Sequence, residues 1–175
     1  MNTQTDKSST QKPLVKGVVR AKLNTGFVLR LADGESCFVP IKYLIGYTNE
    51  ERFLRYDSIG IGDTMEAIVI GISRRPTASE VDALEYRAEM ALSRGASVEF
   101  YVVNVAEEGV AVRLLSPQCA VGQSAYIHRA KLEDDTFETL RRECQLHVDE
   151  RVGRIATVLS VRRNEKSRLS VKLVA

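Results

Sequence analysis

The sequence predicts an all-β protein made of two tandem five-stranded barrels, each with a short helix between its third and fourth strands. Short runs rich in Val, Ile and Phe alternate with turn signals such as Asn24-Thr25-Gly26 and Glu107-Glu108-Gly109. The same order of runs and turns occurs twice, and Gly109 follows Gly26 by 83 residues. A length of 175 residues suits one large domain or two smaller ones. The repetition favours two.

The chain is accordingly divided into three parts. Residues 1–13 are mostly Ser, Thr, Gln and Asn, so they bury too little apolar surface to offset the entropy of ordering. We expect them to form a flexible polar tail. Residues 14–94 and 95–175 are the two expected barrel domains, with the boundary near Arg94-Gly95.

In the first domain, strands are expected at 15–23, 27–31, 37–39, 65–72 and 90–93, and a short helix is expected over 49–56. Pro40 ends the third strand because it cannot donate to a strand ladder. The segment 76–89 is left open. Its Ala, Glu and Leu content favours a helix, whereas the repeat requires only a loop. It is either a solvated acidic insertion or a surface that docks a partner.

The second domain repeats this order. Strands are expected at 98–105, 110–115, 124–127, 151–161 and 169–173. Leu169-Ser170 is taken as the equivalent of Leu92-Ser93 in the first copy. A helix is expected between Thr136 and Cys144, because Phe137, Leu140 and Cys144 recur on one face. Five strands with a helix between the third and fourth are the layout of an OB-fold.

Composition excludes several other classes of protein. Three well-separated cysteines and two histidines argue against a disulfide framework and a structural zinc site. No apolar run reaches the roughly 18–20 residues that span a bilayer, and the N-terminus has no apolar signal-peptide core. We expect a cytoplasmic protein. No nucleophile, phosphate-loop or metal-ligand pattern is present, so we expect no enzymatic activity, no cofactor and no metal site.

Positive charge is unevenly distributed. The whole chain has a net charge of only +2, from 25 Lys and Arg against 23 Asp and Glu. The last 25 residues, however, contain seven basic residues, and Glu165 is the only acidic residue among them. These seven are Arg151, Arg154, Arg162, Arg163, Lys166, Arg168 and Lys172.

Two ordered series of short motifs add a resemblance to this pattern. The first copy contains Lys16-Gly17-Val18-Val19, Gly26-Phe27-Val28, Gly34, Phe38-Val39-Pro40, Leu44, Gly62-Asp63 and Leu92-Ser93. The second contains Gly109, Tyr126-Ile127-His128-Arg129-Ala130-Lys131-Leu132, Asp149 and Leu169-Ser170-Val171-Lys172. In these residues the chain resembles a tandem pair of RNA-binding domains of the ribosomal protein S-one type.

The resemblance implies that single-stranded RNA binds across one face of each barrel, by stacking on aromatic rings and by contacts of basic side chains with phosphates. In the first copy the matching positions are Phe27, Phe38, Arg74 and Arg75. In the second copy they are Tyr126, His128, Arg162, Arg163, Lys166 and Arg168.

Each of these positions also has a purely structural interpretation. Phe27 and Phe38 lie on strands of a small barrel, where an aromatic ring is often part of the core. The arginines of the last hairpin could be solvated side chains. Tyr126 and His128 alternate with Ile127, so if Ile127 points inward both are exposed on the same face.

The sequence therefore favours non-catalytic binding of single-stranded RNA, either messenger RNA or RNA at the ribosome, in translation. Single-stranded DNA stays open as a ligand, because OB barrels bind it too. The alternative is a protein-interaction module that docks on a ribosome, polymerase or nuclease complex through the acidic segment Ser79–Glu89.

Overall fold

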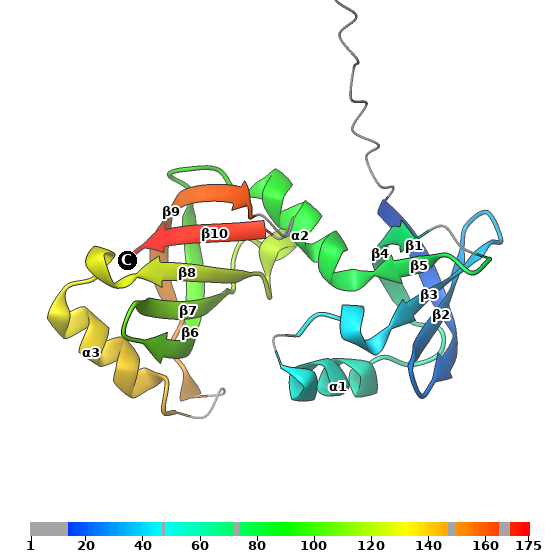
Figure 1. Cartoon of the computed structure of the whole chain (residues 1–175), viewed down its shortest axis with the longest axis horizontal. Coiled ribbons are helices and arrows are strands. Elements are labelled where there is room, and N and C mark those ends of the chain that lie inside the picture. The colour runs from blue at the N-terminus through cyan, green and yellow to red at the C-terminus, as the bar shows by residue number, and fades with distance from the viewer. Residues whose placement is uncertain (1–13, 47, 72–73, 147–149, 165–168) are drawn as a thin grey trace, which may run out of the picture. The chain divides into compact units, whose positions relative to one another are not determined.

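The computed structural model describes residues 14–46, 48–71, 74–146, 150–164 and 169–175. The expected tail of residues 1–13 lies outside this range. The chain divides into two compact units, Met1–Ala83 and Leu84–Ala175. Each unit contains one closed five-stranded barrel (Figure 1).

The first barrel closes in the order β1-β2-β3-β5-β4, and β4 pairs with β1. The 3-10 helix η1 (Ile41–Tyr43) and the helix α1 (Asn49–Ser58) connect β3 to β4. The short helix expected at this position is thereby confirmed. The five strands are β1 (Leu14–Leu23), β2 (Gly26–Leu31), β3 (Ser36–Pro40), β4 (Thr64–Gly71) and β5 (Thr77–Ser79).

The second barrel has the same topology, with β6-β7-β8-β10 followed by β9, which pairs back to β6. The 3-10 helix η3 (Arg129–Lys131) and α3 (Asp134–Glu143) again lie between the third and fourth strands, and η2 (Gln118–Ala120) lengthens the connection from β7 to β8. The strands are β6 (Ser97–Ala106), β7 (Gly109–Leu114), β8 (Ser124–His128), β9 (Arg154–Arg163) and β10 (Leu169–Val174). Both units are OB-fold barrels, as the sequence predicts.

Alternation along the strands builds the core of each barrel. In the first, Phe27 and Leu29 of β2 point inward and are fully buried, whereas Arg30 is exposed. In the second, Ile127 is fully buried, and Leu140 of α3 joins the same core cluster. The outer strand faces are therefore the surfaces left for a ligand.

The fifth strand of the first barrel is where the prediction is wrong. This strand is β5 (Thr77–Ser79), and residues 90–93 do not form it. Helix α2 (Glu80–Ala91) follows β5 directly, and the division between the two units falls within it. In the strand register Phe38 of β3 is the partner of Thr77 of β5, just as Tyr126 of β8 is the partner of Lys172 of β10. The counterpart of β10 in the first barrel is therefore β5, and not the segment around Leu92.

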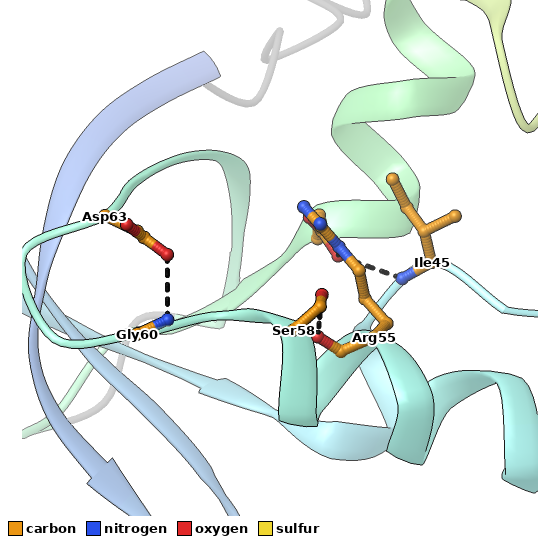
Figure 2. Close-up of polar contacts among 6 residues, drawn as sticks. Ile45, Arg55, Ser58, Gly60 and Asp63 are labelled. Carbon is orange, nitrogen blue, oxygen red and sulfur yellow. Dashed lines mark hydrogen bonds and ion pairs between the residues drawn. The ribbon is translucent and has the colours of Figure 1, made fainter.

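Both ends of α1 are capped. At its start Thr48 and Glu51 form a reciprocal capping box. At its end the Lys22 ammonium donates hydrogen bonds to the carbonyls of Tyr56 (2.8 Å) and Ile59 (3.1 Å). A cation at this place also complements the negative end of the helix dipole. In the turn before β4, the carboxylate of Asp63 accepts from the backbone N–H of Gly60 at 2.8 Å (Figure 2).

The first acidic residue of α2 is buried within the first unit. Glu80 is 4% exposed, and its carboxylate accepts hydrogen bonds from the backbone N–H of Ile45 (3.0 Å) and the Nε of Arg55 (3.1 Å). Figure 2 shows Ile45 and Arg55 converging on this point. Glu80 therefore stabilises the first barrel and is not available as an exposed charge.

Candidate nucleic-acid interface

The outer face of β8 carries an aromatic pair. Ile127 points into the barrel and is fully buried, whereas Tyr126 is partly exposed and His128 is exposed. The Tyr126 and His128 rings are 6.5 Å apart between centroids, at an interplanar angle of 84°. This edge-to-face arrangement leaves ring surface open to solvent, as base stacking requires.

His128 has a defined hydrogen-bonding role in the turn after β8. Its Nδ1 accepts a hydrogen bond from the backbone N–H of Ala130 at 3.1 Å. In the neutral imidazole the proton is then on Nε2, since only one ring nitrogen carries it. The interaction fixes the ring orientation and makes Nε2 available as a donor.

A cation lies beside the aromatic pair. In the barrel register Lys172 of β10 is the neighbour of Tyr126, and Ser160 of β9 is the neighbour of Lys172. Arg162, two residues along the same face of β9, is opposite Ser170. The side chains of Lys172 and Arg162 are exposed, and neither side chain forms a hydrogen bond or ion pair within the ranges that the structure describes. Aromatic and cationic groups thus form one continuous outer surface.

Arg163 is in a different situation. Its guanidinium forms ion pairs with Glu89 at 2.6 Å and with Glu85 at 3.5 Å. Glu85 is 7% exposed and also accepts from the backbone N–H of Leu169 at 3.2 Å. The two carboxylates offset the charge of Arg163 and hold the start of β10. Lys166 and Arg168, the other predicted contacts of this hairpin, lie outside the described residues.

The two aromatic residues predicted to stack on RNA in the first barrel point to opposite sides of the barrel wall. Phe27 is fully buried and stacks on Tyr56, with centroids 5.0 Å apart, so neither face of its ring is open to a base. Phe38 points outward, is partly exposed, and has Val28 and Thr77 as register neighbours. Only Phe38 is placed for stacking, at the position that Tyr126 has in the second barrel.

The basic residues predicted for the first barrel do not lie on its strands. Arg74 and Arg75 are exposed and lie between β4 and β5. The strand position beside Phe38 is Thr77, where the second barrel has Lys172. The centre of the first outer face therefore lacks the cation that the second has.

Sequence reasoning missed Lys172 as a site residue. It stands in the Leu169–Lys172 motif, and alternation with the inward-pointing Val171 and Leu173 could have assigned it to the outer face. It also missed Glu85 and Glu89 as partners of Arg163. No local signal connects residues that are more than 70 positions apart.

The structure also bears on metal sites and membrane-spanning helices. Within the described ranges, no group of three or more His, Cys, Asp or Glu side chains is placed to hold a metal ion. No helix in that part of the chain is long and apolar enough to cross a membrane.

The fold and its outer faces define the class as tandem OB-fold barrels. No protein-family model matches the chain, and no curated protein sequence matches it. Among solved structures, an uncharacterized protein of Methanocaldococcus jannaschii, MJ1198, aligns at 16% identity and a TM-score of 0.32, over 45% of this chain and 93% of its own.

Two further structures align over most of this chain. One is a Streptococcus pneumoniae multidomain protein described as having nucleic-acid-binding domains, at 14% identity and a TM-score of 0.30, over 92% of this chain. The other is the Drosophila Unr segment CSD456, at 16% identity and a TM-score of 0.27, over 94%. The alignments span 50% and 63% of those two chains.

Proposed function

We propose that this chain is a non-catalytic protein that binds single-stranded RNA, either messenger RNA or ribosome-associated RNA, through the outer faces of its barrels. The observation that carries the proposal is the surface in the second barrel on which Tyr126 and His128 share one face of β8, with Lys172 on the adjacent strand. Phe38 supplies a second stacking ring in the first barrel.

The chemistry of these groups suits a single strand. An exposed ring stacks on any base with roughly 1–3 kcal/mol, and lysine or arginine along the strand neutralises phosphates. No acidic residue is a register neighbour of Tyr126, whose partners are Ala111 and Lys172. Binding should therefore show mild base preference and weaken as salt concentration rises.

The two barrels contribute unequally in this proposal. The second has two aromatic rings and an adjacent cation, and the first has one ring and a neutral neighbour. We assign the main affinity to the second barrel. Phe38, Arg74 and Arg75 would extend the contact.

The test is fluorescence anisotropy of a labelled unstructured RNA of about 20 nucleotides, a length that exceeds the site of one OB barrel. The wild-type protein is compared with Tyr126→Ala, and Phe53→Ala on α1 is the matched control. Phe53 is 53% exposed and lies outside the proposed face. We expect Tyr126→Ala to weaken binding by about fivefold or more and Phe53→Ala to leave it unchanged.

Two results would refute the proposal. One is an absence of RNA binding by the wild-type protein at low salt. The other is equal affinity of the wild type and Tyr126→Ala, with circular dichroism showing that both are folded. The same titration with DNA of matching sequence measures the preference for RNA.

A second candidate function is protein docking, and one observation favours it for the first barrel. Phe53 and Leu54 of α1 are 53% and 70% exposed, whereas Phe137 and Leu140 of the corresponding helix α3 are buried. Exposed apolar side chains on a helix are typical of contact surfaces. This surface replaces Ser79–Glu89 as the candidate, because Ser79, Glu80 and Glu85 are buried. Loss of partner capture by Leu54→Ser, with RNA affinity unchanged, would support it.

A further inference from the structure

The second unit contains a groove beside the aromatic face. Its volume is about 670 Å³, within the size range of ligand-binding clefts. One wall consists of the end of α2 and the residues after it, including Glu89 and Arg94. The opposite wall is the outer side of β9 with Ser160 and Arg162, and Lys172 of β10 completes the lining.

The electrostatics of this groove favour an anion. Arg94, Arg162 and Lys172 are exposed, and none of them forms an ion pair within the described ranges. The acidic member of the lining, Glu89, is paired with Arg163 at 2.6 Å. Three cations therefore face a groove whose carboxylate is already neutralised by a residue of the same unit.

An unsatisfied hydroxyl provides a second, independent observation. The Oγ of Ser160 is enclosed and has no hydrogen-bond partner within the part of the chain that the structure describes. A buried polar atom without a partner costs roughly 1–3 kcal/mol. Ser160 is among the residues that line the groove. Rotation of its side chain towards the groove is the step that would give this enclosed hydroxyl a ligand oxygen as partner.

We infer that this groove is a phosphodiester subsite, which binds the sugar-phosphate backbone of the strand whose bases stack on Tyr126 and His128. Lys172 connects the two regions, because it is the neighbour of Tyr126 in one direction and of Ser160 in the other. Arg94, from outside the barrel strands, would contact phosphate in the groove. This inference rests on the proposed function and adds to it where the backbone of the bound RNA runs.

Because the groove is inferred to bind phosphate, removing one of its cations should change how strongly RNA affinity depends on salt concentration. Each phosphate contact with a single strand contributes about 0.7 to the slope of log affinity against log salt concentration. Arg94→Gln removes one such contact without altering the aromatic pair. Arg142→Gln is the charge-matched control, since Arg142 is an exposed arginine of α3 in the same unit and does not line the groove.

The experiment titrates an oligouridine RNA of about 12 nucleotides, within the site range of an OB barrel, against four full-length proteins at several salt concentrations. These are the wild type, Arg94→Gln, Arg142→Gln and Tyr126→Ala. We expect Arg94→Gln to weaken binding about threefold to tenfold and to reduce the salt slope by about 0.7. Arg142→Gln should match the wild type, and Tyr126→Ala should weaken binding with an unchanged slope.

The outcomes separate the two proposals. If Tyr126→Ala weakens binding while Arg94→Gln matches the wild type, the subsite is overturned and the proposed function stands. Equal losses for Arg94→Gln and Arg142→Gln would show a long-range effect of net charge, which also overturns the subsite. If the wild-type protein binds no RNA, the proposed function fails and the subsite fails with it.

Discussion

The ring of Tyr126 occupies the space that a side chain at Gly109 would need. A β-carbon built on Gly109 would lie 2.6 Å from the Tyr126 hydroxyl oxygen and 2.2 Å from the carbonyl oxygen of Ile127. Gly109 also has a φ of +153°, which side-chain-bearing residues rarely adopt. The absence of a side chain at the start of β7 is thus a condition for the position of the ring on β8.

Gly109→Ala should therefore impair both folding and binding. We expect a loss of roughly 1–3 kcal/mol in the free energy of unfolding, because backbone atoms must move to admit the methyl group. RNA affinity should also fall, because the ring of Tyr126 is displaced. Chemical denaturation and anisotropy measure the two effects. Gly60→Ala is the control, since its β-carbon would make only an ordinary contact at 3.6 Å.

Phe27 and Phe38 should respond oppositely to substitution. Phe27→Leu should lower the unfolding free energy by about 1–3 kcal/mol, since it leaves a cavity in the core and loses the stacking on Tyr56. Phe38→Ala should change stability less, and it should weaken RNA binding by a smaller factor than Tyr126→Ala does. Thermal melts and titrations of both variants check this. If Phe38→Ala binds RNA with wild-type affinity, this ring makes no contact with RNA, and the proposed binding is confined to the second barrel.

Charge reversal at Glu80 should destabilise the first barrel. Glu80→Lys removes the acceptor for the N–H of Ile45 and places a cation beside Arg55. We expect a loss of roughly 1–3 kcal/mol from the unsatisfied groups alone, visible in a denaturation curve. Glu35→Lys, in an exposed turn, should be nearly neutral. Equal stability of the two variants would contradict the role assigned to Glu80.

The three cysteines should differ in reactivity towards an alkylating reagent. Burial raises the pKa of the Cys37 thiol above its ordinary value, so less of the reactive thiolate is present at any given pH. Cys37 is also only 2% exposed, whereas Cys119 and Cys144 are partly exposed. At about pH 8, close to the ordinary thiol range, mass spectrometry should find Cys119 and Cys144 modified first. Cys37 should react only after unfolding, and rapid modification in the folded protein would refute this.

The fold was largely predictable because alternation and turns are local signals. The inward position of Ile127 follows from the sequence of β8 alone. The fifth strand of the first barrel was missed because β5 has three residues and follows Pro76, too few to show alternation. Met90 and Ala91, which suggested the start of a strand, are instead the last two residues of α2, and Leu92 follows the helix.

The candidate site was predictable only in part. Motif and alternation assigned Tyr126 and His128 to one face, and this is where the structure has them. Neither signal distinguishes Phe27 from Phe38, because both rings lie on strands and only the closed barrel decides which one points inward. The ion pairs of Arg163 with α2 depend on tertiary contacts that join distant segments.

The position of α2 determines how the protein can be dissected. Ala88 and Leu92 belong to the core cluster of the second barrel, and Glu85 binds the first backbone N–H of β10. A recombinant fragment that starts at Gly95 would lack all three residues and expose the apolar surface they cover. A fragment meant to isolate RNA binding by the second barrel should begin at Leu84, where the second unit starts, so that Glu85, Ala88 and Leu92 are all retained.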